Sequence, residues 1–268
     1  IERNMNRGGG LLGVPTGLSD LDRIISGLVP GDLIVIAARP SMGKTALAVT
    51  MALNASRRGY SVLFFSLEMP RTQVLYRLAA QETELNLQSL RTGTISHASY
   101  EHSLSSMTRL AELPITIDDR SGITVIEISH LARKLKPAVL FIDYLQLLKP
   151  AKREERRDLE VAAMTFSLKC LAKEMQIPVV LLCQLNRQVE SRSNKKPMLS
   201  DLRESGSIEQ DADIVLFPFR EAVYDPKPDN ANTAEIIVAK HRNGETGSIR
   251  VSFLGNCVAF KNFSDRRV

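Results

Sequence analysis

Residues 33–49 have the sequence LIVIAARPSMGKTALAV, and this stretch decides the fold. The apolar run over 33–37 predicts a buried strand, and the helical pattern from residue 44 predicts a helix directly after a short loop. Gly43, Lys44 and Thr45 match the end of the G-x-x-x-x-G-K-[ST] phosphate loop, with Ala38 in place of its first glycine. Such a loop needs inward-pointing backbone N–H groups, a lysine for the β and γ phosphates and a hydroxyl for Mg²⁺. The stretch therefore predicts a nucleotide site.

Strands and helices alternate outward from this motif. Apolar runs predict further strands at 62–65, 115–117, 138–142, 179–182 and 214–217, and helical patterns lie near 44–57, 71–83, 97–111, 124–135 and 158–175. This alternation is typical of a parallel sheet covered on both faces. After residue 230 the pattern changes to consecutive strands at 234–242, 248–254 and 257–261. We therefore expect a doubly wound, mainly parallel α/β domain with an antiparallel C-terminal extension.

The composition suits a large globular domain. The chain has 268 residues, of which 44% are hydrophobic, and this is enough to bury a substantial core. Its three cysteines, Cys170, Cys183 and Cys257, have neither C-x-x-C nor Cys/His ligand spacing, which argues against a disulfide framework or a zinc site and favours a reducing cytosol. No apolar run approaches the roughly 20 residues that cross a bilayer. We expect a cytoplasmic protein without a membrane partner, and the net charge of +5 permits a polyanionic one.

Three stretches are expected to lie outside regular structure. Residues 1–13 are polar and contain three consecutive glycines, so we interpret them as a linker ahead of a domain over 14–268; a flexible native terminus is the alternative. Residues 149–157 (KPAKREERR) and 186–200 (NRQVESRSNKKPMLS) are predicted to form long exposed loops.

A phosphate site also needs a carboxylate for Mg²⁺. Asp143 ends the run AVLFID at 138–143, where it would lie beside the phosphate loop at the carboxyl edge of the sheet. An aspartate that only begins a turn is the alternative. Many ATPases place a glutamate directly after this aspartate to activate water, but this chain has Tyr144. Hydrolysis would therefore need a base from another strand.

Two other strand ends offer candidates for the chemistry. Glu68 follows the strand in SVLFFSLEMP (61–70) and precedes Pro70, so it could serve as the base or only complement a helix dipole. Gln184 ends the strand in IPVVLLCQLN (177–186) as an uncharged donor, suited to sense a γ-phosphate or to remain a surface amide.

Two cations lie close together near the C-terminus, in AKHRNGETG at 239–247. Asn243 and Gly244 predict a hairpin turn, because both tolerate positive φ. Strand periodicity predicts that Lys240 and Arg242 share a face with the apolar residues Ile236 and Val238, with His241 on the other face. A solvated hairpin tip is the ordinary interpretation of such a pair.

Six motifs in order resemble the RecA-type motor domain of the DnaB-like hexameric replicative DNA helicases. They are PTGLSDLDRIISGLVPGDLIVIAARPSMGKT, FSLEMP, LFIDYLQL, QLNR, DLRESGSIEQDAD and KHRNGETG, and the resemblance extends over about residues 13–261. It implies a RecA-like P-loop NTPase fold and a motor that uses ATP and Mg²⁺ in a homohexameric ring. Such a motor would move on single-stranded DNA and unwind duplex in the 5′ to 3′ direction. The helicase pattern accommodates Ala38.

The resemblance also implies roles for the candidates. The nucleotide would be held by Ser41, Met42, Gly43, Lys44, Thr45 and Ala46, with Thr45 and Asp143 on the metal. Glu68 would be the hydrolytic base, and Gln184 would couple the γ-phosphate to the DNA-facing loops. Arg242, with Lys240 beside it, would be the finger that reaches the nucleotide of the neighbouring subunit, whereas His241 would be structural.

DNA contact is expected from the LRESGS segment. The resemblance assigns Arg203, Glu204 and Gly206 to the single-stranded DNA backbone, and one arginine among small residues with free amides suits phosphate contacts. A helix cap is the alternative. The loop 186–200 is a further DNA candidate because it carries Arg187, Arg192, Lys195 and Lys196. Primase, a helicase loader and an N-terminal helical domain before residue 14 are implied as well.

Two other functions fit the same fold. A recombinase-like protein would use ATP to build a filament and exchange strands, but it would need a longer DNA loop than LRESGSIEQDAD. An ATP-gated scaffold would bind protein partners and hydrolyse slowly, without stimulation by DNA. A small-molecule kinase is disfavoured, because nothing in the chain resembles an acceptor site and the hairpin cations would be unexplained.

Overall fold

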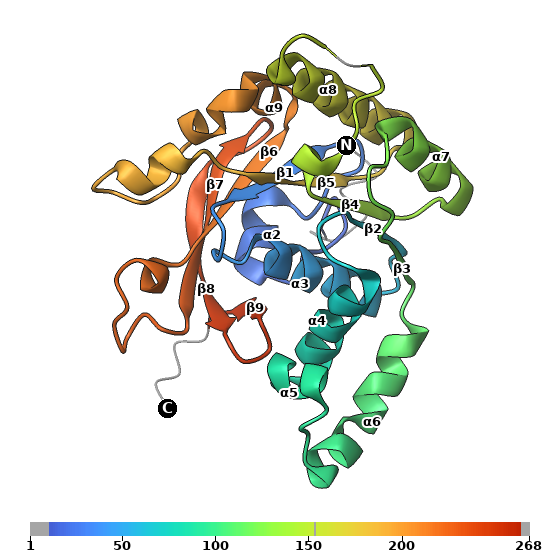
Figure 1. The fold of residues 1–268 in the computed structure, drawn as a ribbon, viewed down its shortest axis with the longest axis vertical. Coiled ribbons are helices and arrows are strands. Elements are labelled where there is room, and N and C mark those ends of the chain that lie inside the picture. The colour runs from blue at the N-terminus through green and yellow to red at the C-terminus, as the bar shows by residue number, and fades with distance from the viewer. Residues whose placement is uncertain (1–10, 153, 264–268) are drawn as a thin grey trace.

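One sheet organises the chain. In the computed structural model, which describes residues 11–152 and 154–263 and leaves out the side chains of residues 203–205, nine strands pair in the order β3-β2-β4-β5-β1-β6-β7-β8-β9 (Figure 1). They are β1 (Leu33–Ala38), β2 (Val62–Ser66), β3 (Ile115–Asp118), β4 (Val139–Asp143), β5 (Val179–Gln184), β6 (Ile214–Phe219), β7 (Thr233–His241), β8 (Gly247–Leu254) and β9 (Ala259–Asn262).

The strand order confirms the predicted fold class. Strands β1 to β6 pair in parallel, and β6 to β9 continue the sheet antiparallel. Every residue of β1, β2, β4 and β6 is buried, which explains why these strands appear in the sequence as continuous apolar runs. The carboxyl ends of β1, β2, β4 and β5 therefore meet at one edge, where the candidate residues lie.

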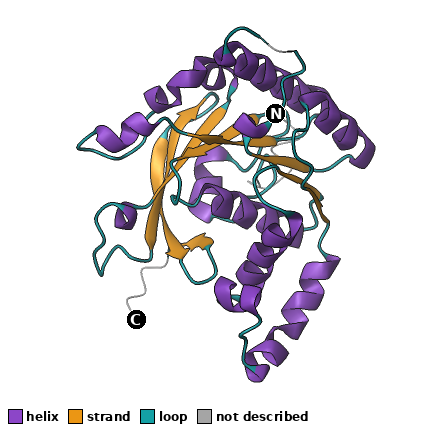
Figure 2. Ribbon diagram, viewed as in Figure 1, coloured by secondary structure: helices purple, strands orange, loops and turns teal. Residues whose placement is uncertain are grey.

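Helices cover both faces of the sheet (Figure 2). The longer ones are α3 (Lys44–Arg57), α4 (Arg71–Thr83), α6 (His97–Glu112), α7 (Val125–Leu135) and α8 (Arg157–Met175), close to their predicted bounds. Short helices α2 (Ser19–Ile25), α5 (Leu87–Thr92) and α9 (Gly206–Asp211) and 3-10 turns η1 (Leu145–Leu147), η2 (Arg187–Ser191), η3 (Leu199–Ser205) and η4 (Glu221–Val223) were not predicted. These pieces are too short to carry a clear hydrophobic period.

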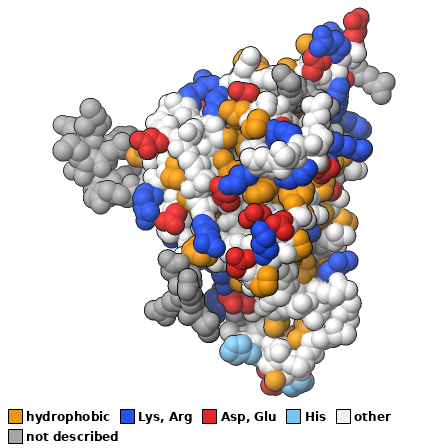
Figure 3. All heavy atoms as spheres, turned by 90° about the vertical axis from the view of Figure 1, so that its left-hand side faces the viewer, with side chains coloured by type: hydrophobic (Ala, Val, Ile, Leu, Met, Phe, Trp, Pro, Cys, Tyr) orange, Lys and Arg blue, Asp and Glu red, His pale blue; other side chains and the backbone are white. Residues whose placement is uncertain are grey.

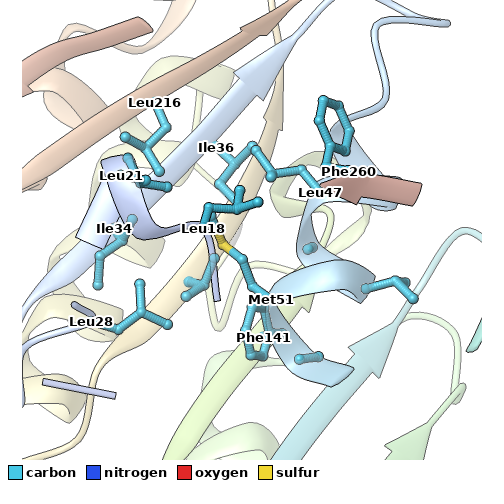
Figure 4. Packing of buried hydrophobic residues seen from close by; sticks show 14 of the residues in the cluster. Leu18, Leu21, Leu28, Ile34, Ile36, Leu47, Met51, Phe141, Leu216 and Phe260 are labelled. Carbon is cyan, nitrogen blue, oxygen red and sulfur yellow. The ribbon is translucent and has the colours of Figure 1, made fainter. Parts of the chain in front are cut away.

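The core has two layers, one on each face of the sheet. On one face, Ile36 and Phe141 pack with Leu47 and Met51 of α3 and with Leu21 of α2 (Figure 4). On the other, alternate residues of the same strands pack against α7, α8 and α9. Burying such a side chain contributes about 1.5–3 kcal/mol relative to leaving it exposed, so the two layers fix the sheet that presents the site.

The beginning of the domain is anchored by a short bridge. Val14 pairs with Leu28 and is buried, and the backbone N–H groups of Leu12 and Gly13 donate to the Ser26 carbonyl. Most of the predicted linker, residues 1–10, lies outside the described residues, so the boundary at residue 14 stays a prediction. No helix in the described parts of the chain is both long and apolar enough to cross a membrane.

A β-bulge in β7 makes the predicted face of Lys240 and Arg242 wrong. Val215 of β6 pairs with Lys240, but the next residue, Leu216, pairs with Val238, so Ala239 is extra. Lys240 therefore faces the α9 side with Val215, whereas Val238 faces the opposite layer. Lys240 and Arg242 do share a side, since both donate to carbonyls of α9, but it is not the side of Ile236 and Val238.

Candidate nucleotide-binding site

The phosphate loop joins β1 to α3 through Gly43. Gly43 caps α3 with φ of 92°, a left-handed conformation that favours glycine. A Cβ here would lie 2.9 Å from the ring of Phe260, so the contact with β9 excludes a side chain as well. The N-terminus of this 14-residue helix places its free N–H groups and positive dipole end toward the loop. The backbone is thus shaped to bind an anion.

Lys44, Thr45 and Asp143 form a compact cluster. The Thr45 hydroxyl donates to Asp143 Oδ2 at 2.7 Å, and Lys44 Nζ lies 3.6 Å from Oδ1. Asp143 is fully buried, and its Oδ1 has no hydrogen-bond partner among the described residues. Tyr144, where other ATPases place a glutamate, instead lies under Lys44, whose Nζ is 4.1 Å from the ring centroid.

Glu68 reaches the same place from β2. Ser66 is the register partner of Asp143, and the Leu67 N–H donates to the Asp143 carbonyl at 2.7 Å. This pairing brings the Glu68 carboxylate into the neighbourhood of Tyr144. Burial raises the pKa of the Tyr144 hydroxyl, and the Glu68 and Asp143 carboxylates raise it further, so the phenol stays neutral near pH 7. Tyr144 can therefore donate a hydrogen bond there but cannot act as a base.

The candidates line one cavity of about 490 Å³, large enough for a nucleotide. Its walls include seven of the predicted residues, namely Ser41, Gly43, Lys44, Thr45, Ala46, Glu68 and Gln184, whereas Asp143 is buried behind Lys44 and Thr45 and is not on the wall. Met42 is not on the wall; its side chain is buried with Ala38 and Phe219 beneath the loop. A larger hollow of about 950 Å³ lies beside β7 and β8 and contains no phosphate-loop residue, so size alone does not identify the site.

Three arginines on this cavity were missed by sequence reasoning. Arg220 follows β6, donates through Nη1 to the Ser41 carbonyl at 3.2 Å and lies 3.8 Å above the Phe253 ring. Its position after a buried parallel strand is the signal that identified Asp143 and could have identified it too. Arg39 and Arg77 also line the cavity. Burial lowers the pKa of Arg77, while Asp143 and Glu68 act in the opposite direction.

Lys240 and Arg242 lie away from this cavity. Lys240 Nζ donates to the carbonyls of Glu209 and Ala212, and Arg242 Nη2 donates to the carbonyl of Gln210. Arg242 Nη1 is also 3.3 Å from the carboxylate of Asp213, which precedes β6. Asp213 pairs with the start of β1, so the length of that strand, about 20 Å, separates it from the phosphate loop.

The structure describes only some of the residues that were predicted to contact DNA. Arg203 and Glu204 belong to η3, but their side chains lie outside the described part of the chain, while Gly206 begins α9 and is exposed. In the loop 186–200, Arg192 pairs with Asp201 and Lys196 with Glu235. Lys195 donates to a backbone carbonyl, whereas Arg187 is exposed at the start of η2. Several cations of this loop therefore stabilise the loop itself.

The sheet and the cluster around Lys44 define a phosphate-loop nucleotide-binding domain of the RecA-like class. The family model of the DnaB-like helicase C-terminal domain matches residues 13–262, and the chain belongs to this family.

Relatives and solved structures agree with this assignment. The chain is 44% identical to the replicative DNA helicase DnaC of Bacillus subtilis and 43% identical to the replicative DNA helicase DnaB of Leifsonia xyli, over 99% of its own length. It spans 60% and 58% of these two relatives. A structure described as the ATPase domain of G40P superposes with a TM-score of 0.94 at 37% identity, covering 98% of this chain and 95% of that one. A DnaB-like replicative helicase, described together with its interactions with primase, gives the same score and identity over 98% of this chain and 65% of that one.

Proposed function

We propose that this chain is the ATP-hydrolysing motor domain of a replicative DNA helicase, acting as a homohexameric ring on single-stranded DNA. The observation that carries the proposal is the cluster of Lys44, Thr45 and the buried Asp143, in which Lys44 and Thr45 line one nucleotide-sized cavity together with Glu68. The names of its relatives support DNA unwinding as the purpose of this hydrolysis. Family membership supports the 5′ to 3′ direction.

The cavity suits ATP with Mg²⁺. Thr45 and Asp143 offer the hard oxygen ligands that Mg²⁺ prefers, and Oδ1 of Asp143, which faces Lys44 but accepts no hydrogen bond among the described residues, has lone pairs left for a metal ion. Bound there, Mg²⁺ would neutralise charge on the β and γ phosphates. Lys44 adds a fixed positive charge on the same phosphates, and the N–H groups of the loop and of α3 orient them.

Glu68 is the candidate base for the attacking water. Among the described residues that line the cavity, Glu68 is the one carboxylate, and Tyr144 is neutral. It would accept a proton from water held in line with the γ-phosphate. Gln184, at the end of β5, can hydrogen-bond the γ-phosphate or this water through its amide without changing charge. We assign it the coupling of phosphate to the chain that follows β5.

The site is completed by a neighbouring subunit. Transferring phosphoryl groups gain greatly from an additional arginine. Arg242 and Lys240 are too far from their own cavity to supply it. Both donate to carbonyls of α9, and Arg242 also pairs with Asp213. We assign both to the cavity of the next copy in the ring, with Arg242 as the finger.

DNA and protein partners follow from the same proposal. Arg203, Glu204 and Gly206 would contact the single-stranded backbone. Basic and acidic side chains interleave on the β7–β8 side (Figure 3), so this face is not a uniformly basic surface for DNA. The structural relative that is described with its interactions with primase supports primase as a partner, and a loader is proposed with it. The unpaired cysteines, one of them exposed, fit a cytosolic location.

The proposal is tested by ATP hydrolysis per subunit, measured with and without single-stranded DNA across a dilution series. We expect stimulation by DNA and a fall in activity per subunit on dilution, because the site needs two copies. Slow hydrolysis that responds to neither DNA nor dilution would contradict the motor and leave an ATP-binding scaffold.

A further inference from the structure

The phosphate loop is fastened to the chain that follows β5. Ala38 and Gln184 are register partners at the ends of β1 and β5. The Leu185 N–H donates to the Ala38 carbonyl at 3.2 Å, and Arg39 Nη1 donates to the Leu185 carbonyl at 2.8 Å. Two consecutive loop residues thus hold both backbone groups of Leu185, so Leu185 cannot move independently of the phosphate loop.

Arg39 extends this attachment through its side chain. Its Nε donates to Glu190 Oε1 at 2.9 Å, in the 3-10 turn η2. The Arg39 side chain is 9% exposed and that of Glu190 is 47% exposed. A charge-assisted hydrogen bond of this geometry is stronger than a neutral one, and the buried end is shielded from solvent. Its strength exceeds that of a fully exposed surface pair.

The connection continues toward the predicted DNA segment. The Asn186 N–H donates to the Asp201 carbonyl at 3.2 Å. The Asp201 carboxylate in turn accepts from Arg192 and from the Met198 N–H, both at 2.8 Å, at the beginning of η3. Hydrogen bonds therefore run from the phosphate loop through η2 to the helical turn that contains residues 203–205.

Arg39 also stands between two cavities. It lines the nucleotide cavity and, with Gln184, a second cavity of about 370 Å³ whose wall includes Asn186 and Arg187. Arg39 is therefore placed to contact both a bound nucleotide and the chain that follows β5.

We propose that the Arg39–Glu190 ion pair is a positioning contact that transmits nucleotide occupancy from the phosphate loop to residues 186–205. The inference rests on the proposed function and names a coupling route beside Gln184. Bound phosphates restrict the motion of the loop through its N–H groups. Because Arg39 bonds to Leu185 and to Glu190 of η2, the motion of these residues is restricted as well. Without the Glu190 charge, the loop still binds phosphate and still holds Leu185, but η2 loses its direct ion pair with Arg39.

The test is hydrogen–deuterium exchange of residues 186–191, with and without a non-hydrolysable ATP analogue. Three proteins are compared: wild type, Glu190→Gln and the control Glu235→Gln. The control removes the ion pair of Lys196, which ties the same loop to β7 rather than to the phosphate loop. Affinity for the analogue is measured in each protein.

We expect the analogue to slow exchange about fivefold or more in wild type and Glu235→Gln, and less than about twofold in Glu190→Gln, a difference typical of coupled sites. Analogue affinity should be equal in all three proteins. Glu190→Asp, which keeps the charge, should recover part of the effect, whereas loss of a surface contact alone would not distinguish Asp from Gln.

Failure of the inference and failure of the proposed function give different results in this experiment. Equal slowing in wild type and Glu190→Gln overturns the inference, as does analogue binding by wild type without any slowing. Absence of analogue binding by wild type overturns the proposed function, and the inference with it. A melting temperature of Glu190→Gln near that of wild type verifies that the variant is folded.

Discussion

Thr45 Oγ1 lies 2.7 Å from Asp143 Oδ2, although 98 residues separate them in the sequence. The contact forms because β1 and β4 run parallel on either side of β5 and end at the same edge of the sheet. A hydroxyl and a buried carboxylate at this edge, with Lys44 beside them, supply the groups that the proposed metal–phosphate complex would need.

Lys44→Ala should reduce ATP hydrolysis about a hundredfold or more, because the fixed cation that stabilises charge on the phosphates is lost. The measurement is steady-state phosphate release at saturating ATP. Lys134→Ala, which removes an exposed lysine on α7, should hydrolyse ATP like wild type. Normal turnover in Lys44→Ala would show that hydrolysis occurs elsewhere.

Lys169→Met should destabilise the fold by about 2–3 kcal/mol, slightly below the usual cost of breaking a buried ion pair, because Arg242 still faces Asp213. Lys169 forms an ion pair with buried Asp213 and donates to the Gly31 carbonyl. Urea unfolding measures the loss. The double variant Lys169→Met/Asp213→Asn should be more stable than the single one; equal stability would mean that the pair is not coupled.

Asp32→Asn should stabilise the protein at neutral pH. Burial, and then the nearby Asp213 carboxylate, raise the pKa of Asp32 above 3.8, against the influence of Lys169, His241 and Arg242. The folded state therefore binds this proton more tightly than the unfolded chain, and wild type gains stability from it as pH falls. The advantage of Asp32→Asn should shrink as pH approaches 3.8. A melting-temperature difference that stays constant with pH would contradict this assignment.

The native protein should expose one reactive thiol. Cys170 lies on the exposed side of α8, whereas Cys183 and Cys257 are buried. Burial raises the pKa of Cys183 to about 12, so at pH 8 only about one molecule in ten thousand would carry the thiolate. A colorimetric thiol assay should find one equivalent in the folded protein and three in denaturant. Fast reaction of all three without denaturant would mean that the core opens readily.

Much of this architecture could be predicted, because its signals are local. Strands buried on both faces appear as apolar runs, and the residue directly after such a run lies at the functional edge, as Asp143 and Gln184 do. The bulge at Ala239 could not be predicted, since it depends on how β7 pairs with β6. That single extra residue moved Lys240 to the α9 side.

Arg39 and Arg77 could not be predicted for a different reason. Arg39 occupies a variable position of the phosphate-loop pattern, and its direction is fixed by Leu185 and Glu190, which are remote in sequence. Arg77 is an ordinary basic residue of α4 until the packing of that helix turns it toward Glu68 and Asp143. Side-chain directions set by tertiary packing leave no local pattern to recognise.

We propose above all that each nucleotide site is completed by Arg242 of a neighbouring copy. The most direct test compares ATP binding with turnover in Arg242→Ala, and then turnover in assemblies that mix Arg242→Ala with Lys44→Ala. We expect ATP affinity within about twofold of wild type, turnover lower by about three orders of magnitude, and partial recovery in the mixture, where some interfaces pair an intact Lys44 with an intact Arg242. Wild-type turnover in Arg242→Ala would contradict the claim.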